Sequence, residues 1–308
     1  MGRVIEIASN HRYLHAERGF LVVDDLENEV SVGRVPLDDL AAVIAHGYQI
    51  NYSNELLVRL SERGVPLVIS NGNHVPVAIF FSLVGNVDQA KRFDAQVAAS
   101  LPTKKRLWAQ IVSAKIRQQA IVLEFFGAPS GRLWKLADKV RSGDPDNCEA
   151  QAAKIYWRSL FCGDFRRERT VPGINSALNY GYTILRAATA RSIIGAGLHP
   201  TLGLHHTNES NGLRLVDDLM EPFRPFVDHQ VHTLWAHRDR ELDSETKKQL
   251  VNVLSHDLVT IGGVSPISSC LSTLAVSLAH VMLGERKTLV IPEPQISIDM
   301  QDQLLSND

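Results

Sequence analysis

The stretch RGFLVVDDLENEVSVGRV, residues 18–35, contains two runs rich in Val on either side of an acidic segment that is typical of a turn. Three more runs of this kind occur nearby: VIEIAS (4–9), PLVISNG (66–72) and HVPVAIFF (74–81). Short runs with β-branched residues, bounded by Gly, Asn, Asp or Pro, are typical of strands. These runs predict a β-rich N-terminal region.

Helical periodicity interrupts these strands once and dominates the rest of the chain. Between Asn51 and Gly64, leucines recur at helical spacing and Gly64 is a stop signal, so one helix is expected there. Beyond this region, further segments have helical patterns, and they are residues 103–126, 146–162, 175–196, 213–237, 244–254 and 266–283. The sequence therefore predicts an α+β protein with a small β-rich domain, residues 1–85, followed by a larger all-α domain, residues 86–308.

Composition places the chain among ordered globular proteins. Of its 308 residues, 44% are hydrophobic and 21% are charged, and 32 basic side chains nearly balance 34 acidic ones. The three cysteines show no CxxC spacing, which argues against a disulfide framework or a zinc knuckle and favours a cytoplasmic location. The N-terminus alternates apolar and polar residues, and Ser, Thr, Pro and His interrupt the uncharged stretch 258–284. Neither export nor membrane insertion is therefore expected.

The net charge of −2 conceals a strong asymmetry along the chain. Residues 1–103 carry a formal charge of −4, residues 104–191 carry +9, and residues 192–308 carry −7. A helical segment with this much positive charge can bind a polyanion by releasing its counterions. The alternative is a set of solvated helix faces that pair with the acidic remainder.

Glu149 is the first candidate for chemistry. It lies in SGDPDNCEAQAAKIYWRSLF, residues 142–161, at the start of a predicted helix. Its position three residues after Asp146 is also the spacing of a capping box, in which a glutamate only satisfies the helix start. The residues alone favour this capping role and leave a chemical role open.

The second candidate is an acidic pair with nearby histidines, in LGLHHTNESNGLRLVDDLMEPFRPFVD, residues 202–228. Asp218 and Glu221 share a helix face, and Pro222 breaks that helix at a cost of roughly 3 kcal/mol. A kink at a carboxylate, with an imidazole upstream, can assemble ligands that a straight helix would scatter. Carboxylates with one histidine form a mostly oxygen site, which suits Mg²⁺ or Mn²⁺, and these ions act on phosphate oxygens.

Three segments carry a resemblance to a known family. They are DNCEAQAAKIYW (146–157), PGINSALNYGYTILRAATARSIIGAGLHPTLGLHH (172–206) and DDLMEPFRPFVD (217–228). In this order and spacing they resemble the signature blocks of the CRISPR-associated integrase, the universal spacer-acquisition enzyme, in its type II form. The architecture of that family, a β-rich domain followed by an α-helical catalytic domain, agrees with the one expected from periodicity. Arg224 and Asp228 also fit the third segment, or they form a structural ion pair.

The resemblance implies roles for individual residues. Glu149 matches the family's metal-binding glutamate in the E-x-x-A-K/R-x-Y pattern, here with one extra residue before the alanine, and His206 closes the P-x-x-G-x-x-H pattern. Glu221 matches the last acidic ligand, which completes the implied catalytic set. Asp218 matches a second acidic position with a supporting or alternative ligand role. A further set of residues is predicted to contact DNA: Lys154, Arg166, Arg167, Arg169 and His205.

The resemblance also implies a metal-dependent DNA integrase and endonuclease of CRISPR adaptation. It would join the 3′-hydroxyl ends of a double-stranded prespacer to the borders of a CRISPR repeat by transesterification, with Mg²⁺ or Mn²⁺ and no nucleotide cofactor. The implied partners are double-stranded DNA (the prespacer and the repeat with its leader), a second copy of the chain bound through the β domains, and a small ferredoxin-like protein that bridges two such dimers. The residues alone leave two other functions open: a DNA-binding scaffold without catalysis, and a metal-dependent phosphohydrolase of small substrates.

Overall fold

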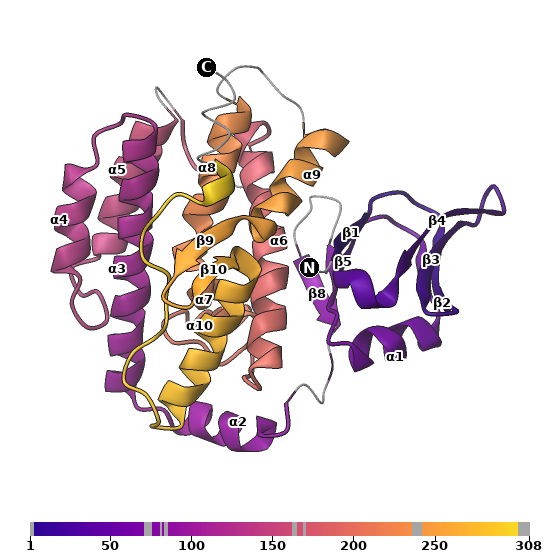
Figure 1. Cartoon of the computed structure of the whole chain (residues 1–308), viewed down its shortest axis with the longest axis horizontal. Coiled ribbons are helices and arrows are strands. Elements are labelled where there is room, and N and C mark those ends of the chain that lie inside the picture. The colour runs from indigo at the N-terminus through magenta and orange to yellow at the C-terminus, as the bar shows by residue number, and fades with distance from the viewer. Residues whose placement is uncertain are drawn as a thin grey trace. The chain divides into compact units, whose positions relative to one another are not determined.

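The computed structural model describes residues 3–70, 76–80, 82, 86–161, 165–168, 171–235 and 242–300. The chain forms two compact units, residues 1–87 and 88–308 (Figure 1). The first is rich in strands and the second is rich in helices, which confirms the predicted α+β class.

The strands of the first unit form two sheets. Its elements are β1 (Arg3–Ile7), β2 (Arg12–Glu17), β3 (Phe20–Asp25), β4 (Val30–Pro36), the 3₁₀ turn η1 (Leu37–Asp39), β5 (Leu40–Ala45), β6 (Ile50–Tyr52), α1 (Asn54–Glu62), β7 (Leu67–Ser70) and β8 (Pro76–Phe80). Within the described residues, β1, β5, β7 and β8 form one four-stranded sheet in that order, and β4, β3, β2 and β6 form another. The pairs β1–β5, β5–β7 and β2–β6 are parallel, and the remaining pairs are antiparallel.

Local sequence determines the tight turns of the second of these sheets. β2 and β3 meet across Arg18 and Gly19, whose φ angles of 49° and 83° lie in the left-handed region that glycine adopts readily. The acidic segment between β3 and β4 turns around Asp25, whose Oδ1 accepts hydrogen bonds from the backbone N–H groups of Glu27 and Asn28. The two runs first identified in the sequence therefore pair as an antiparallel hairpin.

One apolar cluster fills the interior of the first unit. It includes Leu14 and Leu21 of one sheet, Val43 of the other, and Leu56 and Leu60 of α1, all fully buried. The periodic leucines that predicted the helix are thus the face that α1 presents to the core.

The second unit is a set of helices with one small hairpin. Its elements are α2 (Gln89–Ala98), α3 (Leu101–Phe125), α4 (Gly131–Lys139), α5 (Cys148–Leu160), α6 (Ile174–Gly195), α7 (Arg214–Leu219), η2 (Glu221–Phe223), α8 (Arg224–Trp235), α9 (Ser244–Asn252), η3 (Val253–Ser255), β9 (Asp257–Thr260), β10 (Gly263–Pro266) and α10 (Ile267–Met282). Most of α6 is buried, and it packs against α8, α9 and α10. At Gly181 of α6, an added Cβ would lie 2.4 Å from Val227 Cγ1, so this close approach of α6 to α8 requires glycine.

The expectation of an all-α second domain needs a correction. β9 and β10 form an antiparallel hairpin directly before α10, and the turn contains Gly262 and Gly263. Except for Asp257, these four-residue strands lie in an uncharged stretch that continues into the buried helix, so periodicity did not separate them from it. The short helices α2 and α4 were also not predicted from the sequence. None of the helices in the described part of the chain is long and apolar enough to cross a bilayer.

Candidate active site

The helix break at Glu221 and Pro222 is present, as the sequence predicts. α7 ends at Leu219, η2 spans Glu221–Phe223, and α8 begins at Arg224. The kink turns the Glu221 side chain into the protein, where it is only 5% exposed. A continuous surface helix would instead leave an acidic pair in solvent.

Glu149 lies in the first turn of α5, but it does not cap that helix. The carboxylate of Asp144 accepts hydrogen bonds from the backbone N–H groups of Cys148 and Glu149 at 2.9 and 3.0 Å. Asp146, the expected capping partner, forms an ion pair with Arg141 at 2.9 Å. The capping interpretation of Glu149 is therefore wrong, because Asp144 caps the helix and leaves the Glu149 side chain for another contact.

That contact is Lys115, a residue that the sequence did not single out. Lys115 Nζ donates a hydrogen bond to Glu149 Oε1 at 2.7 Å and lies 2.5 Å from Glu221 Oε2. The second contact is a short charge-assisted ion pair. Glu221 Oε1 accepts a hydrogen bond from Arg224 Nε at 2.7 Å. Two glutamates from separate elements thus converge on one ammonium group.

Charge keeps this buried cluster ionised. Burial alone would raise the pKa of Glu221, but Arg224 and Lys115 lower it to about 2. Burial alone would likewise lower the pKa of Lys115, but Glu221 and Glu149 raise it above its ordinary value. Glu221 and Lys115 are therefore both ionised at neutral pH.

His206 is held in a fixed orientation by Asp218. The fully buried Asp218 carboxylate accepts hydrogen bonds from the backbone N–H groups of Leu204, His205 and His206, and it lies 2.6 Å from His206 Nδ1. The hydrogen bond with Asp218 raises the pKa of His206. At Gly203, an added Cβ would lie 3.0 Å from Asp218 Oδ2, which explains the glycine in the P-x-x-G-x-x-H pattern. Because Nδ1 faces Asp218, Nε2 is the nitrogen that His206 can offer to a ligand.

His205 has a different environment from its neighbour. Its exposed ring stacks on the buried ring of Trp108, with centroids 4.3 Å apart and planes at 1°. The two histidine rings meet edge to face at 5.9 Å. His205 is therefore close to His206 and covers one side of Trp108.

Asp228 belongs to a second buried cluster. It accepts a hydrogen bond from Tyr156 at 3.1 Å and a short one from Tyr182. Burial raises the pKa of Asp228 to about 7. The possible ion pair with Arg224 is not formed, because Arg224 bonds to Glu221 and lies over the Tyr182 ring at 4.5 Å.

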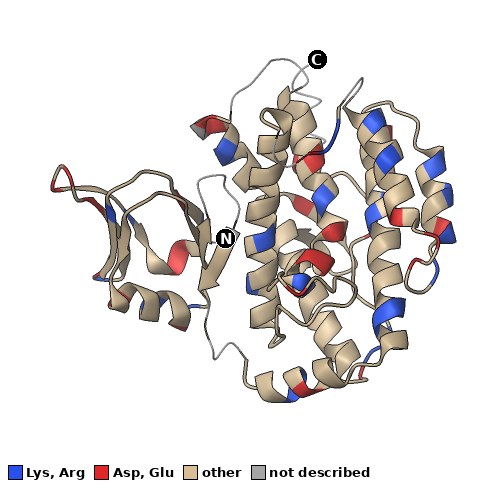
Figure 2. Ribbon diagram, turned by 180° about the vertical axis from the view of Figure 1, so that it is seen from behind, with Lys and Arg blue, Asp and Glu red and all other residues tan. Residues whose placement is uncertain are grey.

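The residues predicted to contact DNA divide by exposure. Lys154 on α5 and Arg166 are exposed. Arg167 donates hydrogen bonds to Asn175 and Asn179 at 2.9 and 2.7 Å, so its guanidinium already has protein partners. Arg169 lies outside the described residues. Basic residues are frequent along α3, α4 and α5 (Figure 2), and the exposed ones include Lys105, Arg106, Arg132, Lys135, Lys139 and Arg158, with Arg141 in the connection between α4 and α5.

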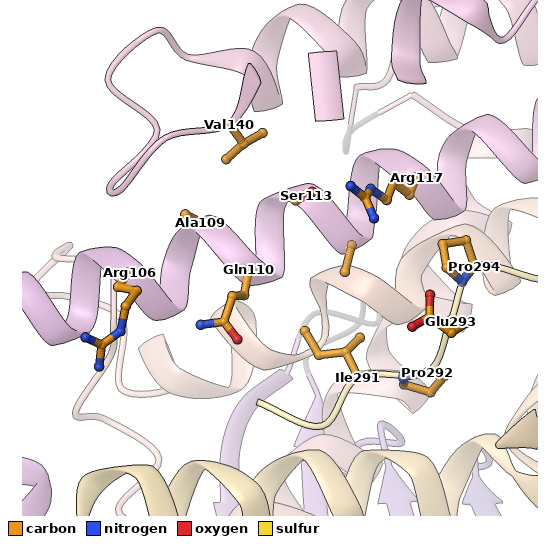
Figure 3. A pocket seen from close by; sticks show the side chains of 11 residues that line it. Arg106, Ala109, Gln110, Ser113, Arg117, Val140, Ile291, Pro292, Glu293 and Pro294 are labelled. Carbon is orange, nitrogen blue, oxygen red and sulfur yellow. The ribbon is translucent and has the colours of Figure 1, made fainter. Parts of the chain in front are cut away.

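A groove of about 450 Å³ lies along another face of α3 (Figure 3). Residues 291–294 form one side of it, and Arg106, Gln110 and Arg117 of α3 form the other. Among the described residues, those that line the groove do not include Glu149 or the other predicted ligands. The chemistry-bearing side chains therefore lie at the Lys115 cluster and not in this groove.

The donors of the Lys115 cluster fit a hard divalent cation. In the described part of the chain, no three His, Cys, Asp or Glu side chains are arranged to hold a metal ion. However, Glu149 and Glu221 already direct oxygens at one cation. His206 is oriented by a carboxylate, as metal-binding histidines usually are. Two carboxylates and one imidazole are donors that suit Mg²⁺ or Mn²⁺.

The chain thus joins a strand-rich unit to a helical unit. The helical unit contains glutamates from two helical segments, an oriented histidine and exposed basic helices, which is the organisation expected of a metal-dependent enzyme that acts on nucleic acids. The chain belongs to the CRISPR-associated Cas1 family, since the model of the family described as CRISPR associated protein Cas1 matches residues 5–258.

Curated relatives agree with this assignment. The CRISPR-associated endonuclease Cas1 of Neisseria meningitidis serogroup C (strain 8013) is 37% identical over 228 residues, which cover 73% of this chain and 75% of that protein. A CRISPR-associated endonuclease Cas1 of Pyrobaculum aerophilum is 28% identical over 298 residues, which cover 90% of this chain and 98% of that protein. The similarity thus includes both units.

Solved structures share the fold at low sequence identity. A casposase bound to an integration product has a TM-score of 0.81 at 20% identity, with 100% of this chain and 99% of that chain covered. A Cas1 protein from Thermotoga maritima has a TM-score of 0.71 at 18% identity, with 94% and 100% covered. At these identities the likeness establishes the fold alone.

Proposed function

We propose that this protein is a divalent-metal-dependent integrase and endonuclease of CRISPR adaptation that joins prespacer 3′-hydroxyl ends to repeat borders. The observation that carries the proposal is the convergence of Glu149 and Glu221, from α5 and η2, on the ammonium of Lys115, with the oriented His206 close enough for Glu221 to raise its pKa. A structural cap or a surface acidic pair would not need this arrangement. Membership of the Cas1 family, whose curated relatives are endonucleases, supports the same function.

The proposed reaction is a balanced exchange of phosphodiester bonds. A bond forms between the attacking 3′ oxygen and phosphorus, and the bond from phosphorus to the 3′ oxygen of the repeat strand breaks. The attacking hydroxyl loses its proton to solvent and the leaving oxygen gains one, so neither a nucleotide nor an oxidant is consumed. With water as the nucleophile, the same site would act as a nuclease.

The residues of the chain have separate tasks in this proposal. Glu149, Glu221 and His206 Nε2 would hold Mg²⁺ or Mn²⁺, which when bound polarises the scissile phosphate. Asp218 keeps His206 in one orientation, because its oxygens already accept three backbone hydrogen bonds and contact Nδ1. We therefore assign Asp218 the supporting role and not that of a direct ligand.

DNA is the proposed substrate because of the exposed basic side chains beside the site. Those of α3, α4 and α5, together with Arg166, give the helical unit a surface suited to phosphate backbones.

A protein partner is suggested by a solved structure. A Cas6–RT–Cas1–Cas2 complex contains a chain of similar fold, with a TM-score of 0.76 at 19% identity that covers 96% of this chain and 36% of that one. This likeness supports the proposed assembly with a small ferredoxin-like partner protein.

The proposed homodimer would form through the first unit. β4 is an edge strand of its sheet, and Val30 and Val32 on it are 54% and 58% exposed. Apolar side chains on an unpaired edge are suited to pairing with another copy. Val32→Lys should convert the dimer to a monomer in light scattering, while Val22→Ala, which changes a buried neighbouring strand, should not. An unchanged Val32→Lys dimer would place the interface elsewhere.

A joining assay tests the proposed function. A labelled duplex with 3′-hydroxyl ends is incubated with a plasmid that carries a repeat array, with the partner protein and Mg²⁺ or Mn²⁺. Label should enter the plasmid at the repeat borders, and a 3′-deoxy duplex should not be joined. Hydrolysis of small phosphoesters without joining would favour a phosphohydrolase instead, and metal-independent binding alone would favour a scaffold.

A further inference from the structure

We propose that Lys115 is a placeholder cation, which occupies the space between Glu149 and Glu221 until DNA arrives and thereby makes divalent-metal binding depend on DNA. This inference rests on the proposed function, because it assigns Glu149 and Glu221 to a metal ion. It adds a regulatory step and a residue that the family resemblance did not supply.

The position of Lys115 is the first argument. Its side chain is 12% exposed and its ammonium contacts both glutamates, at 2.7 and 2.5 Å. A divalent ion bridging the same two carboxylates would compete with the ammonium for the same oxygens. Metal binding at this site therefore requires Lys115 to move.

Charge balance is the second argument. Glu149 and Glu221 are matched by Lys115 and Arg224, so the cluster is neutral before any ion binds. A divalent cation alone would leave excess positive charge in a site whose carboxylates are 26% and 6% exposed, and uncompensated buried charge is costly. Each DNA phosphate supplies a negative charge that offsets part of this excess. Metal and DNA should consequently favour each other's binding.

The contrast between the two cations is the third argument. Arg224 is fixed, because its Nε donates to Glu221 Oε1 and its guanidinium lies over the Tyr182 ring. Lys115 has a flexible four-carbon stem, which can carry its ammonium away from the two carboxylates. Lys115 is thus the cation that can exchange a carboxylate for a phosphate, while Arg224 keeps Glu221 in place.

Mn²⁺ binding to the full-length protein tests the inference without any turnover. The free-Mn²⁺ electron paramagnetic resonance signal is followed with and without a duplex that ends in 3′-deoxy nucleotides, and the signal of the duplex alone is subtracted. For the wild type, DNA should raise Mn²⁺ affinity about tenfold or more, which is the range of typical coupling between sites. Lys115→Met, which keeps the length of the stem without the charge, should bind Mn²⁺ about tenfold more tightly than the wild type before DNA is added.

A matched variant and a second arm keep the test decisive. Lys248→Met removes an exposed lysine on α9 and should leave Mn²⁺ affinity unchanged. Equal Mn²⁺ affinity of Lys115→Met and wild type without DNA would overturn the placeholder role. If Lys115→Met does not fold, the wild type alone is measured. A wild-type protein whose Mn²⁺ affinity does not increase when DNA is added would also overturn the placeholder role. Failure of the proposed function is seen separately, as absence of joining by the wild type in Mn²⁺.

Discussion

Glu221 and Asp228 are two buried carboxylates on one kinked helical segment, yet their surroundings differ in kind. Glu221 is 5% exposed and Asp228 is 1% exposed, so burial penalises the charge of both. Arg224 and Lys115 offset that penalty at Glu221 and lower its pKa to about 2. Glu221 therefore stays an anion that can hold a cation.

Asp228 has uncharged partners instead. The hydroxyls of Tyr156 and Tyr182 donate to it, but burial outweighs them and raises its pKa to about 7. A carboxyl that takes up a proton near neutral pH is a poor metal ligand and a good structural hydrogen-bonding group. The comparison separates a reactive carboxylate from a structural one by the charge of the groups that bond directly to each, since their burial is similar.

The largest expected effect is on strand joining. Glu149→Gln or Glu221→Gln should each lower joining in Mg²⁺ by about 10³-fold, because a carboxylate that holds the ion is lost, while duplex binding stays nearly intact. Asp228→Asn, a substitution of the same kind in the structural cluster, should retain most joining. The measurement is the rate of label transfer to a repeat plasmid. A folded Glu149→Gln protein that joined at the wild-type rate would remove Glu149 from the site.

Lys115 provides the next largest effect, on stability. Lys115→Met leaves the buried Glu221 and the half-buried Glu149 without their shared cation, so it should lower the free energy of unfolding by ~3–5 kcal/mol in metal-free buffer. Mn²⁺ should restore part of this loss. Urea denaturation with and without Mn²⁺ measures both quantities. Lys248→Met is the control and should stay within about 0.5 kcal/mol of the wild type.

The sequence supplied the carboxylates and histidine of the candidate site but not the cation between them. Glu149, His206 and Glu221 occur in recognisable patterns, and Pro222 signals that Glu221 lies at a kink. Lys115 carries no such signal, because one lysine in a long amphipathic helix usually lies in solvent. Only the packing of α3 against α5 and η2 buries its ammonium.

The fold, like the site, could be predicted from the sequence only in part. Strong periodicity and turn chemistry located most of the helices and the β3–β4 hairpin, because these signals are local. The capping of α5 by Asp144 was not predictable, since Asp146 has the standard spacing and Asp144 caps the helix from a turn with left-handed φ angles of 48° at Asp144 and 53° at Asn147. Adjacent arginines at 166 and 167 were also indistinguishable in the sequence.

The pH dependence of stability sharpens the comparison of the two carboxylates. Folded Asp228 keeps its proton up to a pKa of about 7, whereas the unfolded chain releases it near 3.8. Between these values the folded state binds more protons, so this group's contribution falls as pH rises, by up to about 4 kcal/mol in total. Tyr156, Tyr182, Arg224 and Arg167 are the groups that surround it.

Asp228→Asn removes this titration. Between pH 4.5 and 7.5 the free energy of unfolding from urea denaturation should therefore decline less for the variant than for the wild type, by roughly the same few kcal/mol. Identical pH profiles would mean that Asp228 is ionised throughout, and the two buried carboxylates would then not differ in charge.

The smallest effect distinguishes two neighbouring arginines on the basic segment. Arg166 is exposed, so Arg166→Gln should lower the slope of log affinity against log salt by about 0.9 for any duplex sequence, and leave stability unchanged. Arg167 donates to Asn175 and Asn179, so Arg167→Gln should cost about 1.5–3 kcal/mol of stability with little change in that slope. Fluorescence anisotropy across a salt series measures the slopes, and urea denaturation measures the stabilities. A reduced slope for Arg167→Gln with an unchanged slope for Arg166→Gln would reverse the assignment, and it would mean that the guanidinium with protein partners in the free chain exchanges them for phosphate when DNA binds.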